Sequence, residues 1–148
     1  MNEPSAEPPG STPPWEQPPV ASAPSPYAAA PRPMTPADER TWAMLSHVVP
    51  AVCSVLSAGT VGFVGSLIIY LLYKDRGPFV RAAAASSLNI QLTAVVVMLV
   101  SLPLMLVLIG FVTFAVAAIA ALVLNIIGAV RANEGQWWTP PLTIRFVS

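Results

Sequence analysis

Charged side chains are absent from two long stretches of this chain, residues 41–73 and residues 82–130. The stretches begin directly after Arg40 and Arg81, and they end before Lys74 and Arg131. A charge at the centre of a bilayer costs roughly 3 kcal/mol on insertion scales, so hydrocarbon excludes charge. A water-soluble domain has no reason to avoid charge over such lengths. The pattern therefore predicts an integral membrane protein built from α-helices.

Local signals place a first helix at about residues 36–57. Thr35 is a suitable N-cap, and Pro36 suits the first helical position. Asp38 and Glu39 carry the charge that the positive end of a helix favours. Pro50 is expected to kink this helix, because proline removes a backbone hydrogen-bond donor.

Residues 41–73 can form one long helix or two short ones. A single helix of this length would measure about 50 Å, which exceeds a hydrocarbon core of about 30 Å. Turns near Gly59 and Gly110 would instead give four spans, with every Lys and Arg on one side of the membrane. The positive-inside rule prefers that arrangement. We therefore predict four transmembrane helices, with both termini cytoplasmic.

The remaining spans follow from the same turns. The second span, residues 62–73, is short, and whether it crosses the bilayer fully is left open. The third is expected to start at Pro78 and to reach about residue 108 with a kink at Pro103, and the fourth to cover residues 111–131. The fold class predicted is thus an all-α membrane protein.

The composition divides the chain into three parts. Residues 1–36 hold most of the 17 prolines and too few apolar side chains to fold, which predicts a disordered Pro-rich cytoplasmic tail. Residues 37–134 form the predicted four-helix transmembrane domain, and residues 135–148 an interfacial C-terminal segment. The zero net charge argues against nucleic-acid binding. A single cysteine, Cys53, argues against a disulfide within the chain, and no metal or cofactor is expected.

Four polar side chains lie inside the apolar helices and are candidates for bonds between helices: His47, Asn89, Gln91 and Asn125. Amides in hydrocarbon need partners, and bonds between membrane helices contribute around 1 kcal/mol. Asn89 and Asn125 lie near the cytoplasmic ends of neighbouring antiparallel helices, so we expect them to bond to each other. The alternative interpretation is a polar lining for a substrate path. His47 is interpreted as a packing donor, with a proton-responsive group as the alternative.

Small residues and tryptophans suggest further contacts. Ala58, Gly62 and Ser66 form a row of small residues spaced four apart, which predicts close helix packing within the bundle or, alternatively, dimerisation. Aromatic rings with a polar edge favour membrane interfaces, and three flank the apolar stretches as candidate anchors: Trp42, Trp137 and Trp138.

Four motifs in order resemble the DUF4870 family of small bacterial membrane proteins. They are DERTWAMLSH at 38–47, YKDRGPFV at 73–80, LNIQL at 88–92, and RANEG at 131–135 followed by PLTIRF at 141–146. That family is distantly similar to the Tic20 component of the plastid protein-import translocon. The resemblance implies a four-helix membrane domain with no established activity. Members typically carry a His shortly after the Phe-Val pair, and here residues 81–84 have none, so no role of that His is carried over.

No catalytic arrangement emerges from the sequence. No carboxylate lies inside the spans, and Ser54 and His47 are seven residues apart on one helix, too distant for a dyad. We therefore predict a non-enzymatic helical module of the bacterial plasma membrane that packs with other membrane proteins. A small oligomeric transporter or channel is the alternative. The expected partners are the lipid bilayer together with other membrane proteins or further copies of the chain.

Overall fold

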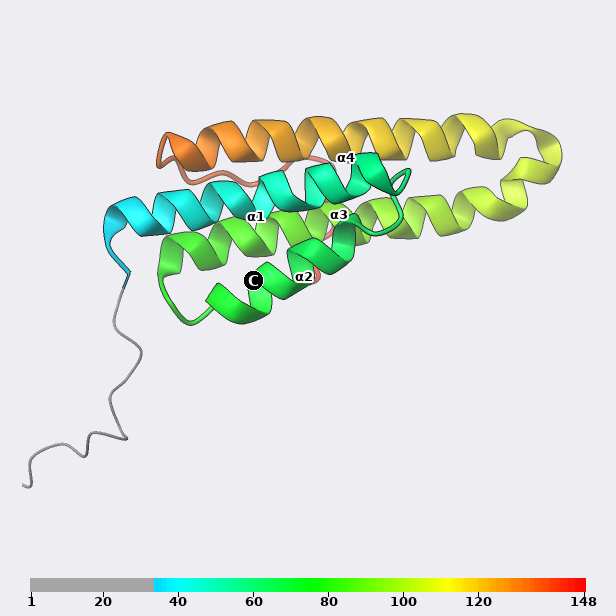
Figure 1. The fold of residues 1–148 in the computed structure, drawn as a ribbon. Coiled ribbons are helices and arrows are strands. Elements are labelled where there is room, and N and C mark those ends of the chain that lie inside the picture. The colour runs from blue at the N-terminus through cyan, green and yellow to red at the C-terminus, as the bar shows by residue number, and fades with distance from the viewer. Residues whose placement is uncertain (1–33) are drawn as a thin grey trace, which may run out of the picture. The chain divides into compact units, whose positions relative to one another are not determined.

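Residues 34–148 are described by the structure, a computed structural model, so most of the expected tail lies outside the described residues. The described part confirms the all-helical class (Figure 1). Its elements in chain order are α1 (Pro36–Leu56), α2 (Gly62–Tyr73), α3 (Pro78–Leu104), the short 3-10 turn η2 (Met105–Val107) and α4 (Ile109–Asn133).

The ends of the first helices follow from the local sequence. The Thr35 hydroxyl accepts a hydrogen bond from the backbone N–H of Asp38 at 3.2 Å, which satisfies one free donor of the first turn of α1. Pro36 and Pro78 both lie in the first turn of a helix, where the missing N–H costs nothing. The turn between α1 and α2 contains Gly59 at φ +91°, a conformation that favours glycine.

The connection between α3 and α4 lies earlier in the chain than the sequence predicted, at residues 105–108. Helix α3 ends at Leu104, with Pro103 in its last turn, and Leu108 adopts a left-handed conformation at φ 65°. Helix α4 then begins at Ile109, ahead of the predicted residue 111. A Cβ on Gly110 would lie only 2.1 Å from the carbonyl oxygen of Ser101. The tight turn therefore depends on a close backbone approach that only glycine permits.

The helices pack as two connected antiparallel hairpins. Helix α1 contacts the other three helices, whereas α2 contacts α1 and α3 and, within the described residues, not α4. The α3–α4 hairpin extends past the turn that joins α1 to α2 (Figure 1). Ile90, Ala94 and Ala121 form the apolar centre of the bundle, with Leu124 and Trp138 packed against it.

Charged residues at the start of α1 contact the ends of two other helices. One carboxylate oxygen of Glu39 accepts a hydrogen bond from the backbone N–H of Phe79 at 3.2 Å, at the start of α3. Arg40 lies against the turn after α4, because a Cβ on Gly135 would be 2.7 Å from its Nε. The negative charge thus lies at a positive helix end and the positive charge at a negative one, as the helix dipoles favour.

Two helices are long and apolar enough to cross a membrane: α3 with its 3-10 extension, Pro78–Val107, and α4, Ile109–Asn133. Helix α2 is apolar but shorter. Large apolar side chains remain exposed on the outer faces of all four helices, for example Val52, Leu71, Val100 and Ile119. Such a surface suits hydrocarbon and not water. The coarser prediction of a helical membrane protein therefore stands, and the crossing of all four helices stays a prediction.

Candidate functional site: a buried polar network

One polar side chain from each of the four helices joins a single buried network. His47 of α1 lies 3.2 Å, through Nδ1, from Oδ1 of Asn125 on α4. The hydroxyl of Ser87 on α3 donates to the same oxygen at 3.1 Å, and it lies 3.0 Å from the hydroxyl of Ser66 on α2. These four side chains are at most 1% exposed. We call His47, Ser66, Ser87 and Asn125 the polar network.

The donors of the polar network can be assigned by satisfying every group. The side-chain N–H of Asn125 donates to the carbonyl oxygen of Ala121 at 2.8 Å, which directs its Oδ1 to the other helices. That oxygen has two lone pairs and accepts from Ser87 and from His47 Nδ1–H. Since Ser87 uses its proton on Asn125, Ser66 donates to Ser87. The assignment gives His47 one tautomer, protonated on Nδ1.

A small residue on α4 makes room for the His47 ring. A Cβ built on Gly128 would lie 2.5 Å from His47 Cε1 and 2.6 Å from Nδ1, so the ring rests directly on the glycine. The Trp138 ring meets the imidazole edge-on, with centroids 6.2 Å apart. The imidazole is therefore fixed by packing as well as by its hydrogen bond.

Two further polar contacts follow along α3 beyond Ser87. The Gln91 amide donates to the Ser54 hydroxyl of α1 at 3.2 Å. A Cβ on Gly62 would lie 2.0 Å from Ser54 Oγ, so α2 begins directly over this pair. Further along, the Ser101 and Thr113 hydroxyls lie 2.7 Å apart and join α3 to α4. Helix α3 thus carries most of the polar contacts inside the bundle.

The predicted bond between Asn89 and Asn125 is wrong. Asn125 faces His47 and Ser87, whereas Asn89 binds the backbone of the C-terminal segment, residues 135–148. Asn89 Oδ1 accepts from the N–H groups of Phe146 and Val147, each at 2.9 Å, and its amide donates to the Val147 carbonyl at 2.9 Å. The two asparagines therefore have separate partners, and those of Asn89 come from the C-terminal segment, which is remote in sequence.

The C-terminal segment runs along α3 and turns back. The Trp138 carbonyl accepts from Ser86, and the N–H of Ile144 donates to Thr93 Oγ1 at 3.0 Å, further along the helix. The segment then returns, and its Ser148 carbonyl oxygen accepts from Arg81 Nε and Nη2 at 3.2 and 2.9 Å. Non-helical backbone next to a membrane helix needs such partners for its polar groups.

The small residues and the tryptophans take varied positions. Gly62 and Ser66 are buried in α2, but Ala58 lies in the turn before it, so the predicted row does not run along one helix. Trp42 stacks on Tyr73 with centroids 4.1 Å apart. Trp137 is 66% exposed and meets Phe79 edge-on, whereas Trp138 packs inward against the core. Their role as interface anchors stays a prediction.

Sequence reasoning missed Ser87 entirely and treated Ser66 only as a small residue. A signal for the polar face was present in the spacing. Ser87 and Gln91 are four residues apart, and His47 and Ser54 are seven apart, so each pair shares one face of its helix. Serines are common in membrane helices, however, and their spacing becomes informative only when the neighbouring helix carries a matching pair.

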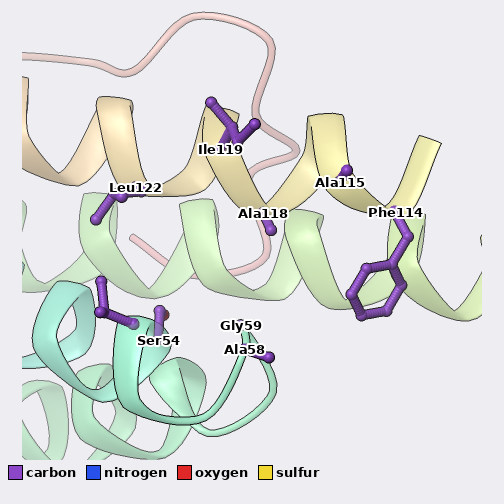
Figure 2. Close-up of a pocket in the computed structure, with 9 residues that line it drawn as sticks. Ser54, Ala58, Gly59, Phe114, Ala115, Ala118, Ile119 and Leu122 are labelled. Atoms are coloured by element: carbon purple, nitrogen blue, oxygen red, sulfur yellow. The ribbon is translucent and has the colours of Figure 1, made fainter. Parts of the chain in front are cut away.

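An apolar groove of about 350 Å³ lies between α4 and the turn after α1 (Figure 2). It is lined by small residues, including Gly59 and Ala118, and by larger ones, including Phe114 and Ile119. Among residues 34–148, no three His, Cys, Asp or Glu side chains come together in a group that could hold a metal ion.

The fold and the polar network define a membrane-associated helical bundle whose interior is held together by side-chain hydrogen bonds. More particularly, the chain belongs to the magnetosome magnetite crystal formation protein family, whose model matches residues 38–147. The expected membership of the DUF4870 family and the likeness to Tic20 are therefore wrong, because the motifs that suggested them lie within the stretch that matches this other family. No curated protein and no solved structure matches the chain.

Proposed function

We propose that this chain is a non-enzymatic, membrane-embedded helical module that acts where magnetite crystals form and works by packing its outer faces against other membrane proteins. Its family supports the setting, since the matching family is described by magnetite crystal formation in magnetosomes. We further propose that all four helices lie in the bilayer, with both termini on the cytoplasmic side of a bacterial membrane.

The observation that carries the proposal is the contrast between the interior and the outer surface. Within residues 34–148, every buried polar side-chain atom has a hydrogen-bond partner. The hydrogen-bonding groups of the polar network are thus occupied by contacts that join the four helices. The outer faces, by contrast, present large apolar side chains such as Leu72, Leu99 and Phe111. A bundle of this kind can contact its neighbours through apolar packing, and its outer faces present few polar groups that could bind or react with a substrate.

The transporter alternative is less well supported by the same residues. A substrate path needs polar groups that face a cavity and exchange partners as the substrate passes. His47 and Asn125 are instead closed off, at 1% and 0% exposure, and are bonded to each other. The apolar groove of Figure 2 is lined almost wholly by aliphatic and aromatic groups, with Ser54 as its polar member.

Crosslinking in the native membrane followed by purification in mild detergent tests the proposal. A packing module should retain a membrane protein in fixed stoichiometry, and Ile119→Asn or Val123→Asn on the outer face of α4 should release it. Asn133→Leu, at the exposed end of α4, is the matched control and should not. The purified chain alone in liposomes should conduct neither ions nor protons. Flux that disappears in a folded Asn125→Leu variant would refute the module and favour the transporter.

Cysteine labelling tests the proposed topology. In a variant that lacks Cys53, single cysteines at Thr60 and Val107 should react with reagent from the outer side only. Cysteines at Asp75 and Glu134 should react from the cytoplasmic side only. If Thr60 and Asp75 are labelled from the same side, α2 does not cross the bilayer.

A further inference from the structure

A second cavity lies between the C-terminal segment and α3, with a volume of about 360 Å³. Ala82 and Ala85 form part of its wall on α3, next to the polar side chains of Ser86 and Asn89. The opposite wall is made by the C-terminal segment itself, including Trp137, Trp138, Pro140 and Arg145. Among the described side chains that line it, only that of Arg145 is charged, and it is exposed.

The position of Arg145 is unusual for a membrane protein. The neighbouring residues fix its level, because the N–H of Ile144 donates to Thr93 and the N–H of Phe146 donates to Asn89. At a helical rise of 1.5 Å, these partners lie about 12 to 18 Å beyond Arg81 along α3. The fold thus brings a cation back beside a stretch that the sequence keeps free of charge. With α3 crossing the bilayer as proposed, an ionisable group at this level is a candidate functional site.

The cavity offers Arg145 a route toward the membrane surface. It is lined by Ala82 and Ala85, the α3 residues that lie toward Arg81 and the cytoplasmic end. Ser148 also lines it, and its backbone oxygen already accepts hydrogen bonds from two N–H groups of Arg81 and from the Tyr70 hydroxyl. No Asp or Glu side chain of residues 34–148 lines the cavity to pair with the Arg145 guanidinium, a group that binds phosphate oxygens in a bidentate fashion.

We propose that this cavity is a binding site for a phosphate-bearing group, with Arg145 as the cationic contact and Ser86 and Asn89 beside it. The aromatic wall formed by Trp137 and Trp138 suits the level at which headgroups meet acyl chains. A phospholipid headgroup and a free phosphate share this chemistry. The site goes beyond packing with other proteins, and it remains testable if that function proves wrong.

Binding can be measured on the full chain in detergent by the fluorescence of Trp137 and Trp138, with Trp15 and Trp42 replaced by Phe. One arm titrates inorganic phosphate. The other titrates detergent micelles that contain phosphatidylglycerol or, as the neutral control, phosphatidylcholine. Saturable binding of phosphate identifies a free anion as the ligand, and preference for phosphatidylglycerol alone identifies a lipid headgroup. Either result supports the site.

Three variants decide whether the cavity is responsible. Arg145→Gln should weaken binding at least tenfold, while Arg145→Lys should retain part of it. Ala82→Leu should weaken binding by filling the cavity without changing any charge. Arg131→Gln, at the exposed end of α4, is the matched control and should bind as the parent does. Binding that is unchanged in both Arg145→Gln and Ala82→Leu, or equal for the two lipids with no response to phosphate, would overturn the proposal.

Discussion

Replacing Asn125 by leucine tests the polar network at its centre. Asn125 is fully buried and accepts hydrogen bonds from His47 on α1 and from Ser87 on α3. Leucine has the same branched arrangement of side-chain heavy atoms and good helix propensity, so α4 itself should persist. The change removes two bonds between helices and leaves the His47 and Ser87 donors without an acceptor in an apolar interior.

The expected loss follows from those two bonds. Bonds between membrane helices contribute roughly 0.6 to 1.7 kcal/mol each, so Asn125→Leu should lower the free energy of unfolding by about 1 to 3 kcal/mol. The measurement is reversible unfolding of the detergent-solubilised chain with increasing SDS, followed by circular dichroism. Asn133→Leu makes the same chemical change at the exposed end of α4 and should alter the free energy of unfolding by less than about 0.5 kcal/mol.

A double-mutant cycle separates the network from other effects of the leucine. Ser87→Ala and Asn125→Leu should be coupled by about 0.5 to 1.5 kcal/mol, because the second change costs less once the shared bond is gone. Asn89→Leu and Asn125→Leu should instead be additive, since Asn89 bonds to the C-terminal segment. Strict additivity of the Ser87–Asn125 pair, or coupling of the Asn89–Asn125 pair, would contradict the assignment of partners.

Three further outcomes are expected. Gly128→Ala should destabilise the bundle by about 1 to 3 kcal/mol in the same SDS assay, because its Cβ would lie 2.5 Å from His47 Cε1, whereas Val130→Ala on the exposed face should not. Asn89→Leu should speed hydrogen exchange at Phe146 and Val147 while the helices stay protected, and unchanged exchange would show that the segment is held by other contacts. Glu39→Ala should lower the free energy of unfolding by about 0.5 to 1 kcal/mol at low salt through loss of the contact with the start of α3, with Asp75→Ala, in the loop before α3, as the control.

Features fixed by neighbouring residues were predictable from the sequence. The Thr35 cap, Pro36, the turn at Gly59 and the start of α3 at Pro78 all follow from local chemistry, and the structure confirms each. The end of α3 was less predictable, because Pro103 can kink a helix or lie in its last turn. The close approach of Gly110 to the Ser101 carbonyl favours an α3 that ends directly after Pro103. This contact depends on the packing of two helices.

The partners of the polar side chains could not be read from the chain alone. Asn89 was expected to seek an amide on α4, but it binds backbone groups more than fifty residues away in sequence. The C-terminal segment has no periodic pattern of apolar residues from which its contact with Asn89 could be predicted. Arg145 shows the same limit, because the printed sequence places it outside the charge-free stretches and only the fold brings it beside them.

The location of the polar residues explains how an apolar chain specifies one bundle. Lipid tails are as apolar as leucine, so burying an aliphatic face gives little preference for one helix orientation over another. Hydrogen bonds between side chains do distinguish one helix orientation from another. Ser87 and Gln91 share one face of α3, and they can be satisfied only if α4 presents Asn125 and α1 presents Ser54 at the matching levels. Rotation of α3 would leave both without partners. The interior therefore sets the register, and the apolar outer faces are left free to serve contacts with lipid or with other proteins.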